Sequence, residues 1–524
     1  MEHISNAFDT VRSWGLPTIA LVLVLLYLVS NAVHALTIHP LAKFPGPWWA
    51  ALSRLPFCIE RMRGNQVQWM HRLHLKYGPV VRFCPDEVSY VDQGGSAWKA
   101  IYGQEKGVKE FPRVRAWYVE PFNGVHPITS VPAHDVHRRF RAAFSPAFSE
   151  RALRSQEPLF RRQIDLLVSI LASAAAETGE PANLTELFEF TTFDIMGDLA
   201  LGESLGMLQT QKYSKWMRSL AAGVRIMPVF QFIQHYPLVA KIFDLLEPKW
   251  ATQMKFEAYR HTVDRVDARL ARESSQADIW SYALSAKEDQ RLSLKEMHSN
   301  ADSFMIAGSE TTATAMTALI YFLTTSPNKF SRLKNEIRSR FSSAEEITME
   351  TTAPLKYLNA CIQETLRIYP PLPLGVPREV PSPGATILGR WVPGGTQVSV
   401  HHYASSHSPS NFKDPETFAP ERWLARDAAA GDDDDSTDSA RYRSDRLEAS
   451  QPFIVGPRSC IGKSMAMHEM RLVLARLFFR FDVQLVADVG AAPWNQQKAF
   501  AFWDKKPLMC RIKLASSGTE TSGK

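Results

Sequence analysis

A cysteine near the C-terminal end of the chain lies in a loop of unusual composition. Residues 452–463 read PFIVGPRSCIGK, and the cysteine is Cys460. A thiolate needs donors or nearby positive charge, because a charge away from water is costly. Gly456 and Gly462 permit a turn that aims backbone N–H groups at the sulfur. A helix predicted to begin by Met465 adds its N-terminal dipole, so the loop favours an anionic sulfur that can bind a metal ion.

The spacing of Phe453, Gly456, Arg458, Cys460 and Gly462 resembles the haem-binding signature of the cytochrome P450 family. The resemblance implies that Cys460 is the axial ligand of the iron in haem b, iron protoporphyrin IX. Arg458 would pair with a haem propionate, Phe453 would shield the ring face beside the sulfur, and the two glycines would let the backbone approach the flat ring. A buried cysteine in a glycine-rich loop is the alternative that this motif alone leaves open.

A second motif interrupts a long apolar helix predicted over residues 299–323. It reads Ala307-Gly308-Ser309-Glu310-Thr311-Thr312. A glycine inside a helix costs about 1 kcal/mol, and an acidic group in an apolar helix is unexpected. The motif resembles the family's oxygen-activation helix, in which Gly308 would open a groove for dioxygen, Thr311 would hydrogen-bond the reduced oxygen and Glu310 would relay protons. A kinked core helix with Glu310 at its edge is the alternative.

Three charged residues form a further candidate group. Glu364 and Arg367 lie on one face of a helix predicted over residues 355–368, as a spacing of three requires. Arg422 belongs to Pro420-Glu421-Arg422-Trp423, which resembles the family's Pro-Glu-Arg-Phe element. The resemblance implies a structural triad of Glu364, Arg367 and Arg422 behind the haem, whereas a surface ion pair of Glu364 and Arg367 would have the same spacing.

Three more residues are candidates for binding the propionates. His137 and Arg141 lie in a basic helical segment that resembles the family helix carrying Trp-x-x-x-Arg. His137 stands where the family has tryptophan, so its role is less defined, and Arg141 matches. Arg378, in Val376-Pro377-Arg378, is assigned to the other propionate. A solvated basic helix face is the alternative.

Most of the remaining chain is predicted to be helical, with a minor β part. Apolar residues recur every three or four positions over residues 153–175, 250–272 and 465–481. Short strands are predicted at residues 80–83 and 87–91, and a further extended segment at 385–400. The sequence therefore predicts a mainly α cytochrome P450 fold with one large catalytic domain over residues 44–524. Residues 427–450, which contain four consecutive aspartates, are expected to form a surface insertion.

The N-terminal residues 1–43 are predicted to form a membrane anchor. Residues 13–42 contain no Asp, Glu, Lys or Arg, and this is long enough to cross a bilayer as a helix of about 20 residues. Glu2 and Asp9 precede the apolar stretch and Lys43 and Arg54 follow it, which favours a single-pass protein with a cytosolic catalytic domain. We expect it in the endoplasmic reticulum membrane. A cleaved signal peptide is the alternative, but the basic segment that begins such peptides is missing.

Composition excludes several other classes of protein. The five cysteines show no regular spacing, which argues against a disulfide scaffold and against a cysteine-rich zinc site. The net charge is +6 without a basic stripe among aromatics, so no nucleic-acid partner is expected.

The resemblance as a whole implies a haem-thiolate monooxygenase that uses O2. No flavin or nicotinamide motif is evident, so NADPH-derived electrons would come from a separate NADPH–cytochrome P450 reductase, with cytochrome b5 as a second candidate donor. Substrate contacts are expected from the mostly apolar residues 111–125, 227–236, 304–305 and 372–376, which suggests a lipophilic small molecule. Such side chains would equally suit a core.

Residues 73–82 resemble fungal biosynthetic members of the family that act on terpenoids, polyketides or alkaloids, so a secondary-metabolite pathway is expected. One alternative is an isomerase or dehydratase on the same fold that acts on a peroxide. Another is a non-catalytic haem-binding membrane protein.

Overall fold

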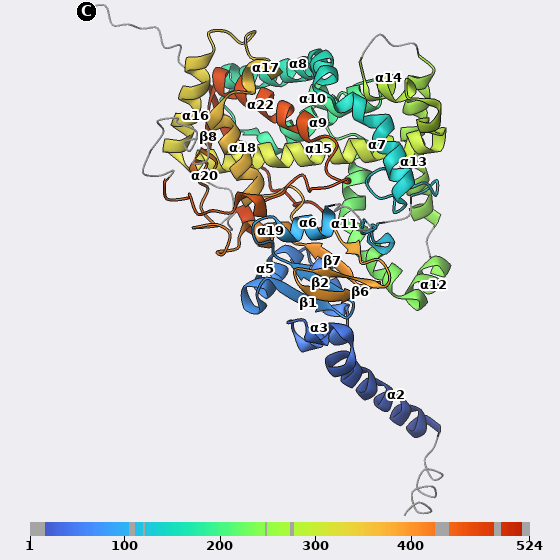
Figure 1. The fold of residues 1–524 in the computed structure, drawn as a ribbon. Coiled ribbons are helices and arrows are strands. Elements are labelled where there is room, and N and C mark those ends of the chain that lie inside the picture. Colours follow the sequence, from blue (N-terminus) through green and yellow to red (C-terminus); the bar gives the residue numbers. More distant parts are fainter. Residues whose placement is uncertain are drawn as a thin grey trace, which may run out of the picture.

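Most of the described chain is helical, and its strands are short. The computed structural model describes residues 16–103, 110–118, 121–246, 249–272, 277–424, 440–486 and 494–515. Figure 1 shows the long helices gathered in one part of the molecule and a small sheet at the end from which the N-terminal helix projects. The predicted mainly α fold with a minor β part is confirmed.

The helices predicted from apolar spacing are present, with ends that differ by a few residues. The longer helices of the body are α5 (Gln66–Tyr77), α7 (His134–Phe144), α8 (Glu150–Ser173), α9 (Leu184–Ala200), α11 (Lys215–His235), α12 (Pro237–Leu246), α13 (Lys249–Leu270), α15 (Leu294–Thr324), α16 (Pro327–Arg340), α18 (Lys356–Ile368) and α22 (Lys463–Arg480). The shorter ones are α3 (Trp48–Leu52), α4 (Leu55–Met62), α6 (Ser96–Tyr102), α10 (Met207–Thr210), α14 (Ile279–Leu284), α17 (Met349–Thr352), α19 (His402–Ser406) and α20 (Glu421–Leu424).

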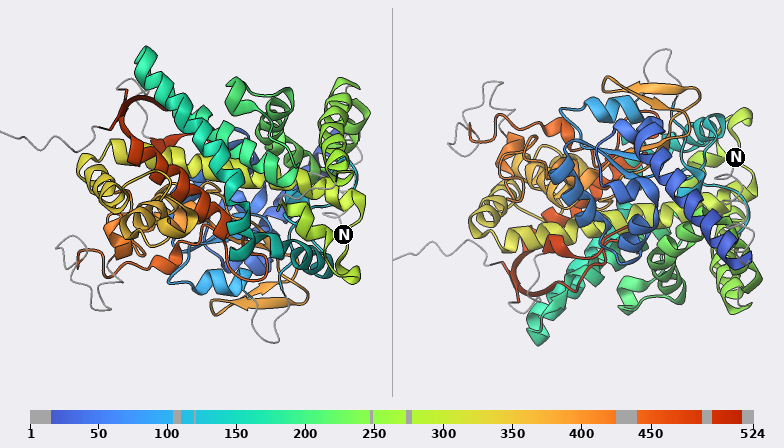
Figure 2. Two further views of the ribbon diagram at one scale, coloured as in Figure 1. Left: turned by 90° about the horizontal axis from the view of Figure 1, so that it is seen from above. Right: turned by 90° about the horizontal axis from the view of Figure 1, so that it is seen from below.

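Helix α15 runs through the middle of the helical part (Figure 1). It begins at a capping box, in which Ser293 and Glu296 exchange hydrogen bonds between side chain and backbone. Its small residues allow close packing against α9, and a Cβ on Gly308 would lie 2.5 Å from the sulfur of Met196. Helices α8 and α22 cross over α15 in the view from above (Figure 2). The glycine inside this helix therefore lets the Met196 side chain of α9 approach closely.

Three small sheets make up the β part. The first has the order β1 (Val80–Cys84), β2 (Glu87–Tyr90), β7 (Gln397–Val400), β4 (Arg378–Glu379), and β2 and β7 are parallel. The second has the order β3 (Ala182–Asn183), β9 (Met509–Leu514), β8 (Phe481–Leu485). The third pairs β5 (Gly384–Ile387) with β6 (Arg390–Pro393). Valines at 88, 398 and 400 are buried, as expected of β-branched residues in a sheet packed against helices.

The N-terminal apolar segment forms the helix α2 (Leu16–Val33), which continues as a wider turn to Ile38. Residues 17–38 are long and apolar enough to cross a membrane, and only 6% of their most apolar stretch is buried against the protein. Figure 1 shows α2 projecting away from the body. These properties are consistent with the predicted anchor, whose residues 1–15 lie outside the described residues.

Candidate functional site

The loop that carries Cys460 is closed by its own backbone. The Cys460 N–H donates to the carbonyl oxygen of Phe453 at 2.8 Å, and the Ser459 N–H donates to that of Gly456 at 3.0 Å. Helix α22 begins at Lys463, three residues after the cysteine. Cys460 therefore stands just before a helix N-terminus, where the backbone N–H groups and the helix dipole favour an anion.

Cys460 differs from the other four cysteines because its side chain is accessible, whereas they are buried. The surrounding protein atoms nevertheless desolvate the thiol, which raises its pKa. A hydrogen bond from the Gly462 N–H and the positive charges of Arg141 and Lys463 oppose this increase in pKa. The neighbouring charges thus favour the ionised sulfur but do not outweigh desolvation, and a positive metal ion would favour the ionised form further.

Gly456 is required by a close approach of two chain segments. Its φ is +81°, and a Cβ there would lie within 1.9 Å of the carbonyl oxygen of Tyr102 on α6. A substituted residue would therefore be strained and would also push the loop away from α6. Gly462, in contrast, has only ordinary neighbours, with Phe148 at 3.8 Å from an added Cβ.

Arg458 and Arg378 are buried together beside the loop, at 4% and 2% exposure. Both face the carboxylate of Glu110, which pairs closely with Arg458 and lies 3.8 Å from Arg378. Arg458 also donates to the Val131 carbonyl at 2.6 Å. The buried Arg378 Nε has no hydrogen-bond partner within the described segments. Sequence reasoning missed Glu110, since an isolated acid before Phe111 carries no motif.

His137 and Arg141, both on α7, face the same region. His137 is 3% exposed, and its pKa is lowered to about 3 by desolvation and by the charges of four arginines: Arg458, Arg113, Arg141 and Arg378. It is therefore a neutral imidazole near pH 7, in contrast with the surrounding cations. Arg141 donates to the Ser459 carbonyl next to Cys460.

The residues of this region fit a haem. Four arginines influence one buried histidine, and the carboxylate that pairs with Arg458 is that of Glu110. Two of these arginines, Arg458 and Arg378, are buried and share this one carboxylate, and such a surplus of buried positive charge is costly unless further anions balance it. A haem would bring two propionate carboxylates and an iron. Arg458, Arg378 and Arg141 would be able to pair with the carboxylates, and Cys460 would be able to bind the iron.

On α15, Thr311 and Glu310 point to different partners. The Thr311 hydroxyl donates to the Ala307 carbonyl at 2.7 Å, so its oxygen lone pairs are left to accept a hydrogen bond. Ala307 is exposed although it lies in the middle of a core helix. The Glu310 carboxylate pairs closely with Lys505 of the C-terminal segment.

Lys505 joins two carboxylates and was missed by sequence reasoning. It is 3% exposed, and its Nζ lies 3.1 Å from Glu189 on α9 in addition to its contact with Glu310. Desolvation raises the pKa of Glu310 to about 7, although Lys505 opposes this increase. The two carboxylates raise the pKa of Lys505, so that the lysine stays charged. A separation of 195 residues hides the pair of Lys505 and Glu310 from any local motif.

The structure brings the three residues of the predicted triad together, with side chains that are all fully buried. Arg367 donates to both oxygens of Glu364 at 2.8 Å. Arg422 donates from Nε to the same carboxylate at 3.1 Å. Trp423 adds its indole N–H at 3.0 Å, which sequence reasoning did not assign.

A second carboxylate completes this network. Asp445 is 9% exposed and pairs closely with Arg422, so two arginines face two carboxylates and the buried charges balance. Asp445 belongs to the predicted insertion 427–450, of which residues 427–439 lie outside the described residues. The rest of that segment is described and contributes buried Leu447 and Ala449 as well. Its polar composition gave no signal for this role.

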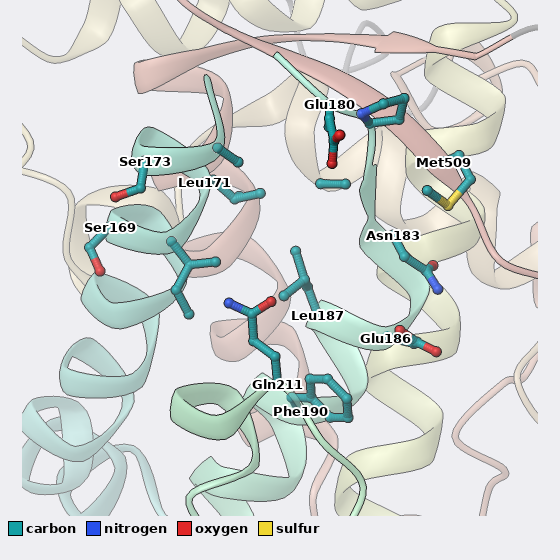
Figure 3. Close-up of a pocket in the computed structure, with 14 residues that line it drawn as sticks. Ser169, Leu171, Ser173, Glu180, Asn183, Glu186, Leu187, Phe190, Gln211 and Met509 are labelled. Carbon is teal, nitrogen blue, oxygen red and sulfur yellow. The ribbon is translucent and has the colours of Figure 1, made fainter. Parts of the chain in front are cut away.

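The segments expected to contact a substrate differ in their surroundings. Phe304 is a core residue, because its ring packs against Phe144 at 4.8 Å between centroids. In residues 111–125, the Trp117 ring packs under the guanidinium of Arg61. Residues 119–120 of this segment lie outside the described residues. A cavity of about 580 Å³ between α8 and α9 (Figure 3) is lined by other residues, among them Leu187 and Phe190, and contains none of the predicted site residues.

Known proteins resemble nearly the whole chain. The family model described as "Cytochrome P450" matches residues 43–511. The cytochrome P450 monooxygenase FUM2 of Gibberella moniliformis is 40% identical over 480 residues, which cover 91% of this chain and 98% of the relative. The cytochrome P450 monooxygenase efuB of Hormonema carpetanum is 37% identical over 525 residues, or 98% of this chain and all of the relative. The averantin hydroxylase of Dothistroma septosporum is 36% identical over 491 residues, or 93% and 89%.

Proposed function

The chain belongs to the cytochrome P450 family, and we propose on this premise which residues, electron donor and substrate class its reaction uses. It is a haem-thiolate monooxygenase that inserts one oxygen atom from O2 into a small organic molecule. When bound, the haem supplies an iron that activates O2 with electrons from a redox partner. The proposals below concern the residues of this chain, with haem b as the form of the cofactor.

The observation that carries the proposal is the setting of Cys460. Its accessible sulfur lies next to a helix N-terminus, with the Gly462 N–H, Arg141 and Lys463 all favouring the thiolate. We therefore propose Cys460 as the axial ligand of the haem iron, because a thiolate donates electron density that favours cleavage of the O–O bond. Phe453, Gly456 and Gly462 would hold the loop in the shape that presents this sulfur.

The propionates are proposed to bind to the arginines beside the loop. Arg458 and Arg378 would each release part of their interaction with Glu110 and pair with a propionate, while Arg141 would approach from α7. His137, being neutral, would contribute a single N–H donor in place of the tryptophan of related proteins. Arginine suits this role because its fork of donors matches a carboxylate.

Thr311 and Glu310 are proposed to handle protons during the reaction. The Thr311 oxygen can accept a hydrogen bond because its own hydrogen is given to Ala307. Glu310, whose pKa is raised to about 7 mainly by desolvation, would exchange protons near neutral pH. Gly308 lets Met196 of α9 approach α15 closely, and its resemblance to the glycine of the oxygen-activation helix is the basis on which we propose that it borders the groove for O2.

The electron donor and location are proposed from the family and the apolar N-terminal helix. We propose that NADPH–cytochrome P450 reductase, with cytochrome b5 as a second donor, supplies the electrons. Residues 1–43 would anchor the protein once in the endoplasmic reticulum membrane, supported by the apolar, mostly exposed helix at residues 17–38. Residues 44–524 would then form the cytosolic catalytic domain.

The substrate is proposed to be a lipophilic intermediate of a fungal secondary-metabolite pathway. This is supported by the fungal relatives, one of which is named a hydroxylase of averantin. Hydroxylation, epoxidation or a related oxidation would all use the same residues, because the site handles O2 and protons and the substrate decides which bond reacts.

The test is turnover by the full chain, loaded with haem, on a panel of lipophilic substrates under ¹⁸O₂. We expect the product to carry one ¹⁸O atom, and we expect its formation to require both NADPH and the reductase. Turnover with a hydroperoxide in the absence of NADPH, giving a rearranged or dehydrated product without ¹⁸O, would instead support the isomerase or dehydratase alternative.

A further inference from the structure

Arg61 on α4 is a buried cation, and the part of the chain that the structure describes supplies no counter-ion for it. Its side chain is 4% exposed, and its guanidinium lies 3.7 Å above the ring of Trp117 and 5.8 Å from that of Phe57. Among the residues that the structure describes, its side chain makes no hydrogen bond and no ion pair, and its Nε is fully buried. Arg54, on the same segment of chain, pairs with Asp86 and Glu87.

An unpaired buried charge is costly, and the protein does little to reduce this cost. Desolvation lowers the pKa of Arg61 to about 9, Cys58 and Cys84 oppose this decrease, and the repulsion of Arg54 adds to it. The guanidinium remains protonated at pH 7, about two units below this value. Contacts with two aromatic rings compensate for part of the free energy lost with the hydration shell, at about 0.5–2 kcal/mol for each cation–π contact. An anion at this place would stabilise Arg61 far more.

The surroundings of Arg61 contain further polar atoms without partners. The two rings beneath its guanidinium, those of Phe57 and Trp117, also line a small cavity with Gln66, His401 and Glu87. The Glu87 carboxylate is paired with Arg54 and so does not neutralise Arg61. The Gln66 Oε1 and the His401 Nε2 are both buried, and neither has a hydrogen-bond partner among the residues of the described ranges. Gln231 on α11 donates to the Trp117 carbonyl, while its own Oε1 has no partner. Four polar groups with unmet hydrogen bonds thus gather around Trp117.

This group lies where the expected substrate segments meet. Trp117 belongs to residues 111–125 and Gln231 to residues 227–236. Gly375, from residues 372–376, lines the same small cavity. All three segments were expected to contact a substrate. Arg61 lies on α4 beside the place where they meet, because its guanidinium packs on Trp117.

We propose that Arg61 binds an anionic group, such as a carboxylate, on the otherwise lipophilic substrate. The inference rests on the proposed monooxygenase function and narrows its substrate class to amphiphilic acids. The carboxylate would pair with the Arg61 guanidinium above Trp117, and the apolar body would extend along residues 111–125 and 372–376. Arg61 would supply the donors to the anion, because the unpaired atoms of Gln66 and Gln231 are amide oxygens, which only accept hydrogen bonds.

The test compares a fatty acid with its uncharged ester. The detergent-solubilised full chain, loaded with haem, is titrated with dodecanoic acid and with methyl dodecanoate, and the shift of the Soret band gives each Kd. Equilibrium dialysis of labelled ligands repeats the measurement independently of the haem spectrum. The wild-type protein is expected to bind the acid roughly tenfold or more tightly than the ester, as charged hydrogen bonds allow.

Arg61→Met is expected to abolish this preference and to leave the affinity for the ester unchanged. Its Tm is expected to stay the same or rise, because the variant removes an uncompensated buried charge, whereas a structural role for Arg61 predicts a lower Tm. Arg61→Lys keeps the charge and retains a preference for the acid, which keeps the test available if the methionine variant fails to fold. Arg63→Met, at an arginine that is 67% exposed, is the matched control and behaves as wild type.

Equal affinity of the wild-type protein for acid and ester, or an unchanged preference in Arg61→Met, overturns the proposal. The carbon monoxide spectrum of the same preparations separates this failure from that of the proposed function. A thiolate-type spectrum without a preference for the acid rejects the role of Arg61 alone, whereas the lack of such a spectrum rejects the haem-thiolate function.

Discussion

The Cys460 N–H and the Phe453 carbonyl oxygen are joined by a 2.8 Å hydrogen bond, which closes the loop behind the sulfur. The loop is fixed on its other side by Gly456, which packs against the Tyr102 carbonyl. The direction of the sulfur therefore depends on protein contacts that exist independently of the iron.

Gly456→Ala is expected to displace the loop. The added methyl group would lie 1.9 Å from the Tyr102 oxygen at a φ of +81°, so the loop or α6 has to move. We expect little haem incorporation, measured as the ratio of Soret to protein absorbance in purified protein. Gly223→Ala, in a helix with open space around it, is the control and should retain haem. Full haem content in Gly456→Ala would show that the loop tolerates the shift.

Glu364→Gln is expected to destabilise the protein by about 3–5 kcal/mol, because it leaves Arg367 and Arg422 buried with one carboxylate fewer. The measurement is the denaturation midpoint in urea, followed by tryptophan fluorescence. Glu350→Gln removes an exposed partner of Arg154 at 3.8 Å and should change stability by less than about 1 kcal/mol. An unchanged midpoint for Glu364→Gln would contradict a supporting role for the triad.

Thr311→Ala is expected to separate NADPH consumption from product formation. The variant lacks the oxygen that accepts a hydrogen bond, so we expect product per NADPH to fall roughly 10–100-fold while hydrogen peroxide release rises. Thr311→Ser keeps the hydroxyl and should retain most of the product. Unchanged product and peroxide in Thr311→Ala would reject the proposed role of this hydroxyl.

Lys505→Met is expected to change the pH dependence of product per NADPH. Glu310 is protonated below its pKa of about 7 and loses its proton above it, so proton delivery falls as the pH rises through 7. Lys505 holds this pKa down, so its removal should raise the pKa of Glu310 and move the midpoint to higher pH. Lys505→Arg keeps the charge and should keep the midpoint. If Lys505→Met and Lys505→Arg have the same midpoint, Glu310 does not control the pH dependence of product formation.

The sequence predicted the residues that lie within local motifs, and it missed those that reach the site from distant segments. The spacing of Glu364 and Arg367 on one helix turn predicted their contact, and Gly456 is required by its close contact with the Tyr102 carbonyl. Lys505, Glu110 and Asp445 lie in loop or terminal segments, and each neutralises a buried charge on another part of the chain. Their partners are set by tertiary packing, and an isolated Lys, Glu or Asp has no pattern that reveals this.

The central claim is that the Cys460 thiolate binds the haem iron, and carbon monoxide binding to the ferrous protein tests it most directly. The wild-type protein is predicted to show the red-shifted Soret band of a thiolate-bound haem, and Cys460→Ser is predicted to lose that band. A Cys460→Ser protein that retains the red-shifted band, or a haem-loaded wild-type protein that lacks it, would contradict the claim.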